Sequence, residues 1–189
     1  DYPFLSSSAN HIFDLTIGYS NNSSLSSSTN TQNKDKINMY NQMAQVLMGH
    51  DATGSIREFD EDGDLSAGGT KLKEVFFVNF ARLIQKDEIK KGSFEFTIGV
   101  TGSNNDAVGD GDFLGDNFNK RLIIADLSGS SQFLVNSPAG DYGILYATSS
   151  TTDGTTHLGT ANTKETPVGL LFYQACLLYT SPSPRDDPL

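Results

Sequence analysis

Three aspartates at alternate positions, Asp60, Asp62 and Asp64, come closest to a recognisable chemistry. Oxygen ligands two residues apart can converge on one hard cation, and this spacing opens the calcium loop of EF-hands. The match then stops, because the sixth position of that loop should be glycine and is Leu65, and the twelfth should be glutamate and is Lys71. The pattern favours a solvated acidic hairpin tip that keeps a sheet edge from pairing promiscuously. Whether a cation binds here is left open.

A second acidic stretch is rich in glycine and contains Asp106, Asp110, Asp112 and Asp116. Calcium-binding β-rolls repeat a strict nonapeptide, which this stretch lacks. It is therefore interpreted in the same way, as a polar loop in which cation binding is left open.

The sequence contains no cluster or motif of residue types that commonly carry out catalysis. The three histidines lie in different segments without a metal-ligand spacing, and no Gly-x-Ser-x-Gly motif is present; the histidines are His11, His50 and His157. Gly109, Gly111 and Gly115 do not follow a strand and open a helix, so they do not form a phosphate cradle. We assign no catalytic residue and no cofactor, and we expect that the protein is not an enzyme.

Four aromatic residues near the end of the chain could line a sugar-binding or protein-binding surface, because amphipathic rings both stack and donate hydrogen bonds. They are Tyr142, Tyr146, Phe172 and Tyr173. Aromatic side chains buried against a sheet are the favoured interpretation.

The elements that would position these residues are mostly strands. Apolar residues alternate with polar ones, or run continuously with β-branched and aromatic residues, over 10–19, 55–59, 70–72, 74–84, 93–100, 121–126, 132–135, 143–147 and 168–173. One amphipathic helix is predicted over 34–48, with Asn33 as its N-cap and Gly49 at its C-terminus. Its core face is predicted from apolar residues that recur at three- and four-residue spacing, Ile37, Tyr40, Met43, Ala44 and Leu47. The predicted fold is mainly β, an antiparallel sheet or sandwich with one helix packed against it.

Composition sets limits on function. The chain has 189 residues and a formal net charge of -10, so a surface that faces nucleic acid phosphates is not expected. No apolar run is long enough to cross a bilayer, and no membrane partner is expected.

The end of the chain resembles a translated sequencing adapter. Residues 176–186 read Cys-Leu-Leu-Tyr-Thr-Ser-Pro-Ser-Pro-Arg-Asp and match the translation of a transposase-type adapter at every position. We therefore expect residues 176–189 to be a non-native tail that is set aside in fold reasoning. Residues 1–175 are expected to be a single β-rich fragment, truncated at both ends, from a longer reading frame in a mixed DNA sample.

Several longer segments resemble one family. They are residues 2–19, 37–49, 86–94, 135–146 and 168–175, which include Tyr-Pro-Phe-Leu-Ser-Ser-Ser-Ala-Asn-His at the start and Asn-Ser-Pro-Ala-Gly-Asp-Tyr-Gly-Ile-Leu-Tyr further on. In this order they resemble virion structural proteins of large contractile-tailed, myovirus-type phages of marine bacteria. The family has no established active-site residues to carry over.

The resemblance implies a structural component of a phage virion, associated with the tail, neck or baseplate and assembled in the host cytoplasm. Its partners would be other virion proteins, in a homo- or hetero-oligomer, and its acidity would keep the free subunit soluble and favour association at higher ionic strength. The alternative is a receptor-binding or adhesin-like module that recognises cell-surface glycans, with calcium held by Asp60, Asp62 and Asp64.

Amplification of the source DNA across the junction between Ala175 and Cys176 tests the adapter interpretation. We expect the uninterrupted reading frame to continue after Ala175 with an apolar segment in place of Cys-Leu-Leu-Tyr-Thr. Unchanged codons beyond Ala175 would contradict the interpretation and make the proline-rich tail native.

Overall fold

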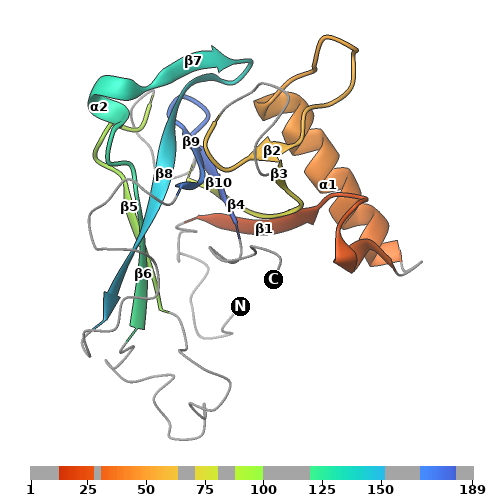
Figure 1. The fold of residues 1–189 in the computed structure, drawn as a ribbon, viewed down its shortest axis with the longest axis horizontal. Coiled ribbons are helices and arrows are strands. Elements are labelled where there is room, and N and C mark those ends of the chain that lie inside the picture. Colours follow the sequence, from red (N-terminus) through yellow and green to blue (C-terminus); the bar gives the residue numbers. More distant parts are fainter. Residues whose placement is uncertain are drawn as a thin grey trace, which may run out of the picture.

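The computed structural model describes residues 13–27, 31–63, 71–80, 88–99, 120–151 and 167–181. It confirms the predicted fold class, a mainly antiparallel β structure with one main helix (Figure 1). The strands are β1 (Asp14–Tyr19), β2 (Phe59–Asp60), β3 (Lys71–Leu72), β4 (Glu74–Asn79), β5 (Glu95–Gly99), β6 (Lys120–Ala125), β7 (Leu134–Ser137), β8 (Gly140–Thr151), β9 (Pro167–Phe172) and β10 (Leu177–Thr180). The helices are the 3-10 helix η1 (Ser24–Ser27), α1 (Thr31–Leu47) and the short α2 (Gly129–Gln132).

One sheet of 8 strands carries the fold. Its order is β1-β4-β10-β9-β8-β6-β5, with β7 paired to β8 beside this path, and every pairing is antiparallel. Strands β2 and β3 form a separate two-stranded hairpin. Within the described residues, β1 and β5 are therefore the two edges of the main path.

The two faces of this sheet bury two different hydrophobic clusters. We call cluster one the group that packs between the sheet, α1 and the hairpin; it includes Tyr40, Ala44, Leu47, Phe59, Phe77, Tyr142, Phe172 and Tyr179. We call cluster two the group on the opposite face, which is Val78, Ile124, Leu145, Ala147, Val168, Leu171, Tyr173 and Leu178. Neighbouring positions along a strand alternate between the two clusters, as Phe77 and Val78 do in β4, because successive side chains point to opposite faces.

The main helix confirms the predicted core face. Tyr40, Ala44 and Leu47 are buried, and Gly49 adopts a φ of 75° directly after the helix, a conformation that favours glycine. The predicted cap is wrong, because α1 begins at Thr31 and Asn33 lies within its first turn. The Asn33 side chain instead accepts a hydrogen bond of 2.5 Å from the Tyr19 hydroxyl, which ties the helix to β1.

Several strand limits differ from the prediction. β7 is shifted to Leu134–Ser137 because α2 includes Gln132, the first residue of the predicted strand 132–135. β8 runs to Thr151 because its polar second half pairs with β6. Parts of the predicted strands, residues 10–12, 81–84 and 100, lie outside the described residues.

The central strand β10 comes from the segment that the sequence interpretation set aside. Residues 177–180 pair with β4 on one side and with β9 on the other, and all four are buried. The tetrapeptide Leu-Leu-Tyr-Thr is apolar and prone to β structure, so it fits a position that is covered on both faces. No helix in the described part of the chain has the length and apolarity needed to cross a membrane.

Candidate functional site

The predicted acidic tip is only partly described, and its first aspartate is engaged in the fold. Asp60 ends β2, is fully buried, and forms an ion pair with Lys71 of the facing strand β3. The backbone N–H of Asp62 also donates to the Asp60 carboxylate at 3.4 Å. Asp64 lies outside the described residues.

Of the predicted calcium ligands, Asp60 is thus part of an ion pair with Lys71. Across the described ranges, no group of three or more histidine, cysteine, aspartate or glutamate side chains could hold a metal ion. The second acidic stretch, with Asp106, Asp110, Asp112 and Asp116, and two histidines, His11 and His157, lie outside these ranges. The remaining histidine, His50, follows α1 and forms an isolated bridge with Ile56.

Three buried tyrosine hydroxyls hold the β2–β3 hairpin to the core. Tyr40 of α1 donates to the Leu72 carbonyl at 2.7 Å and accepts from the Phe59 N–H at 3.3 Å. Tyr142 of β8 donates to the Gly63 carbonyl at 3.2 Å, and Tyr179 of β10 donates to the Asp60 carbonyl at 2.5 Å. Sequence reasoning placed Tyr40 only in an apolar core, because no sequence pattern identifies the partner of a buried hydroxyl.

Burial raises the pKa of Tyr40 and of Tyr179 above the ordinary value of a phenol. Both hydroxyls therefore stay protonated and act as hydrogen-bond donors at neutral pH. A buried backbone carbonyl costs free energy when it has no donor, so these bonds make the hairpin base part of the hydrophobic core.

A second buried polar group is centred on Asp126, which directly follows β6. Its carboxylate accepts hydrogen bonds from the Tyr173 hydroxyl at 2.7 Å and from the N–H groups of Gly92 and Gly129, both at 2.8 Å. A Cβ atom at Gly129 or at Gly143 would lie 2.0 Å from the Tyr173 oxygen, so the pair needs both glycines. Burial first, and the Asp126 carboxylate second, raise the pKa of Tyr173.

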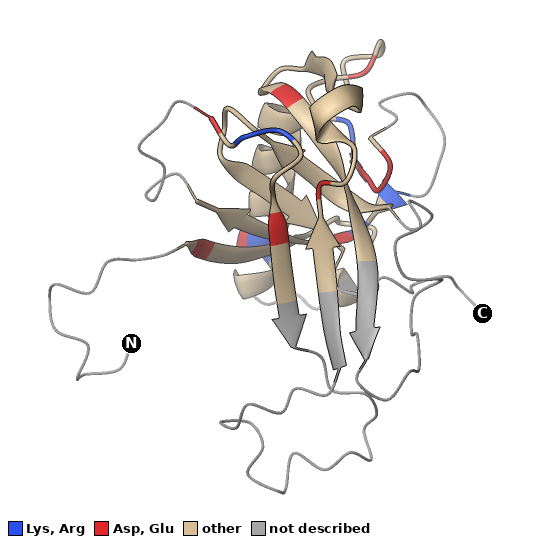
Figure 2. Ribbon diagram, turned by 90° about the vertical axis from the view of Figure 1, so that its left-hand side faces the viewer, with Lys and Arg blue, Asp and Glu red and all other residues tan. Residues whose placement is uncertain are grey.

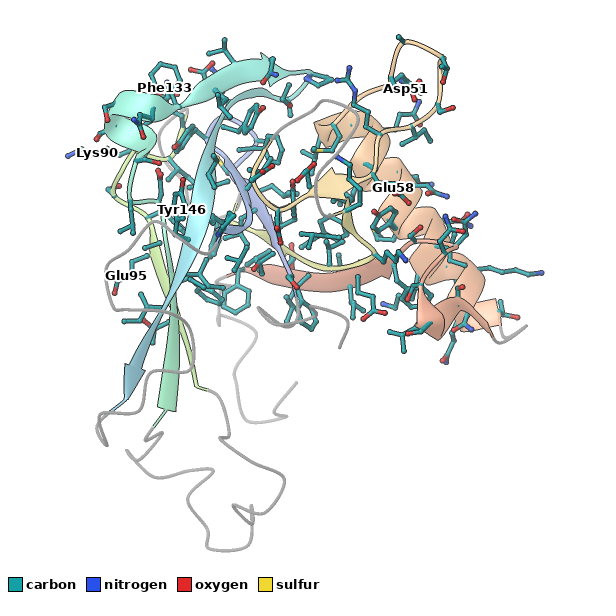
Figure 3. All side chains as sticks on the ribbon, viewed as in Figure 1. Asp51, Glu58, Lys90, Glu95, Phe133 and Tyr146 are labelled. Carbon is teal, nitrogen blue, oxygen red and sulfur yellow. The ribbon has the colours of Figure 1, made fainter. Side chains whose placement is uncertain are left out.

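This arrangement joins three segments of the fold. Three donors occupy the Asp126 carboxylate, and both Asp126 and Tyr173 are buried. The predicted aromatic group behaves similarly: Tyr142 and Phe172 are also fully buried, with ring centroids 5.5 Å apart, and only Tyr146 is half-buried (Figure 3). The favoured interpretation of these four residues as sheet aromatics is confirmed for the three that are fully buried.

The two edges of the curled sheet approach each other at one corner, which we call the seam. The ring centroids of Phe13, next to β1, and Phe96, in β5, are 6.2 Å apart, although β1 and β5 do not pair. Phe80 lies 5.8 Å from Phe13 and 5.6 Å from Phe94. Four phenylalanines thus join the two edges on the face of cluster two.

The seam extends along β1 as an exposed apolar strip. Leu15 pairs with Val78 of β4, which places its side chain on the face of cluster two, yet Leu15 is 60% exposed. Phe13 is 39% exposed. Sequence reasoning predicted the alternation in β1, but it had no signal for the curl that brings β5 to the same place.

Comparison with protein-family models, with curated proteins and with solved structures finds no match to this chain. The functional argument therefore depends on the residues and on the surface that they form.

The buried carboxylate predicts a pH dependence of stability. Burial raises the pKa of Asp60; the hydrogen bond from Lys71 opposes this shift, the Asp62 side chain adds to it, and the Asp62 N–H opposes it. Because the folded pKa is above the unfolded one, the contribution of Asp60 to stability is full below about pH 4 and is lost as the pH rises through the folded pKa. In urea unfolding, we expect the free energy of unfolding of the Asp60→Asn variant to increase relative to that of the wild type as the pH rises through the folded pKa of Asp60.

Asp51 provides the matched control, because hydrogen bonds from Thr53 and Ser55 lower its pKa. Its contribution to stability is present above the unfolded pKa and is lost as the pH falls. The Asp51→Asn variant should therefore lose stability relative to the wild type as the pH rises, the opposite trend. The same trend in both variants would contradict the assigned environment of Asp60.

Proposed function

We propose that this protein is a structural subunit of a phage virion, located in the tail, neck or baseplate, that works by assembly with other virion proteins. The observation that carries the proposal is the seam, where exposed apolar side chains lie at two sheet edges that pair with no further strand among the described residues. An edge strand with exposed apolar residues is a site for pairing with another chain. The family resemblance of the sequence supplies the phage context.

The rest of the described molecule fits a scaffold. The buried Tyr173 hydroxyl bonds to the Asp126 carboxylate, and the hairpin is held by tyrosine hydroxyls from three different elements. The net charge of -10 would keep the free subunit apart from its copies by repulsion until partners are present. A subunit that docks through an edge needs such a rigid core more than a reactive pocket.

Mass spectrometry of purified particles tests the proposal. Trypsin should release residues 37–57 and residues 74–82 as two peptides, since each segment follows a lysine and ends at an arginine. We expect both peptides in phage particles banded on a density gradient from the source community, at a constant ratio to capsid peptides across the band. Peptides found only in the unassembled fractions would contradict the proposal.

A further inference from the structure

Asp60 and Lys71 face each other directly across the β2–β3 hairpin. They are partners in the antiparallel register, and the Lys71 ammonium forms an ion pair with the Asp60 carboxylate. The Asp60 side chain is 1% exposed and the Lys71 side chain is 25% exposed. A buried ion pair is costly to keep charged, because both groups lose hydration. Transfer of one proton from Lys71 to Asp60 turns the pair into a neutral amine in contact with a carboxylic acid.

The backbone on both sides of this pair is held by buried tyrosines. The Tyr179 hydroxyl donates to the Asp60 carbonyl at 2.5 Å, and the Tyr40 hydroxyl donates to the Leu72 carbonyl, next to Lys71, at 2.7 Å. Reacting groups that a fold holds in contact can behave as if present at about 10⁵–10⁸ M. A site closed to water also disfavours hydrolysis of a bond formed there.

A second carboxyl group lies beside the Asp60 carboxyl. The Asp62 side chain hydrogen-bonds to the Asp60 carboxyl, and the Asp62 N–H donates to the Asp60 Oδ1 atom at 3.4 Å. Two carboxyl groups share a hydrogen bond only when one of them carries a proton. Asp62 can therefore take a proton from an attacking nitrogen and return it to a leaving hydroxyl, as a general acid and base.

We infer that Lys71 and Asp60 form an intramolecular amide, an isopeptide bond across the hairpin, with Asp62 as the proton-transfer group. The neutral Lys71 Nζ attacks the Asp60 Cγ, so an N–C bond forms, a C–O bond breaks and one water leaves. The step needs no oxidant or reductant, because an ammonium and a carboxylate give an amide and water. This inference goes beyond the proposed function and does not depend on it. The pH dependence described above for Asp60 belongs to chains in which the amide has not formed.

Mass spectrometry of the folded full chain tests the inference. We expect an intact mass that is lower than the sequence mass by one water molecule. Trypsin should not cut after Lys71, because its amine is then part of an amide, and should release residues 58–73 as one peptide that has lost one water. Fragmentation of this peptide should give no backbone ions from within residues 60–71, since the ring keeps both halves together.

Two variants identify the reacting groups. Lys71→Arg keeps the positive charge and should keep the full sequence mass. Asp62→Asn keeps the size of the side chain but removes the proton-transfer group. In chains purified in urea and then refolded, Asp62→Asn should slow the loss of water about hundredfold, which is within the usual contribution of general acid–base catalysis. Circular dichroism checks that each variant folds.

The chain contains a matched control in a second lysine–aspartate pair. Lys91 Nζ lies 2.6 Å from Asp141 Oδ2, but these side chains are 24% and 26% exposed. Figure 2 colours the basic and acidic positions of the described ribbon. Trypsin should cut after Lys91 as usual, and Asp141→Asn should leave the loss of water from the hairpin unchanged.

A folded wild-type chain that keeps its full sequence mass overturns the inference, because Lys71 and Asp60 then remain an ion pair. Loss of water with normal cleavage after Lys71 also overturns it, since the water then comes from ring closure of Asp62 onto the Gly63 nitrogen. Loss of water from Lys71→Arg has the same meaning. Equal rates in Asp62→Asn and the wild type would overturn the role of Asp62.

Discussion

The sheet depends on β10, because this strand joins its two parts. β1 and β4 lie on one side of it, and β9, β8, β6 and β5 lie on the other (Figure 1). Within β10, Leu178 and Tyr179 are fully buried and belong to opposite clusters, and burying a leucine side chain stabilises a fold by about 1.5–3 kcal/mol. A Cβ at Gly169 of β9 would lie 2.0 Å from the Tyr179 carbonyl oxygen, so the two strands also need glycine at this point. If the source gene continues differently after Ala175, the residues that take the place of β10 in this sheet must form an equally apolar strand.

The same strand links the sheet to the hairpin, since the Tyr179 hydroxyl bonds to the Asp60 carbonyl. Asp126 plays a comparable part at the other end, where it bonds to Tyr173 and to the turn at Gly92. Buried polar groups of this kind stabilise a fold only when every partner is present, because an unmet donor or acceptor loses its hydration without compensation. The buried carboxylates of Asp60 and Asp126 and the buried tyrosine hydroxyls therefore serve the fold.

Local patterns predicted the elements better than their assembly. The alternation in residues 10–19 and the helical spacing of Tyr40, Ala44 and Leu47 predicted β1 and α1, because periodicity reports which side of an element is buried. The helical periodicity could not predict that Asn33, inside α1, accepts a hydrogen bond from Tyr19 of β1, since that contact depends on where β1 lies. Nor could it predict the seam, because the meeting of Phe13 with Phe96 follows from the pairing order and curl of the whole sheet. Interpreting residues 176–189 as non-native also removed β10 from the predicted sheet.

The central claim is that β10 holds the two parts of the sheet together. Hydrogen exchange measured on the full chain and on a chain that ends at Ala175 tests it most directly. Without β10, β4 loses one of its two neighbours, and its backbone groups on that side lose their partners. The account predicts that amides of residues 74–79 and 167–172 exchange at least about tenfold faster in the shortened chain, which corresponds to a loss of about 1.4 kcal/mol or more. Equal protection of these residues in both chains would contradict it.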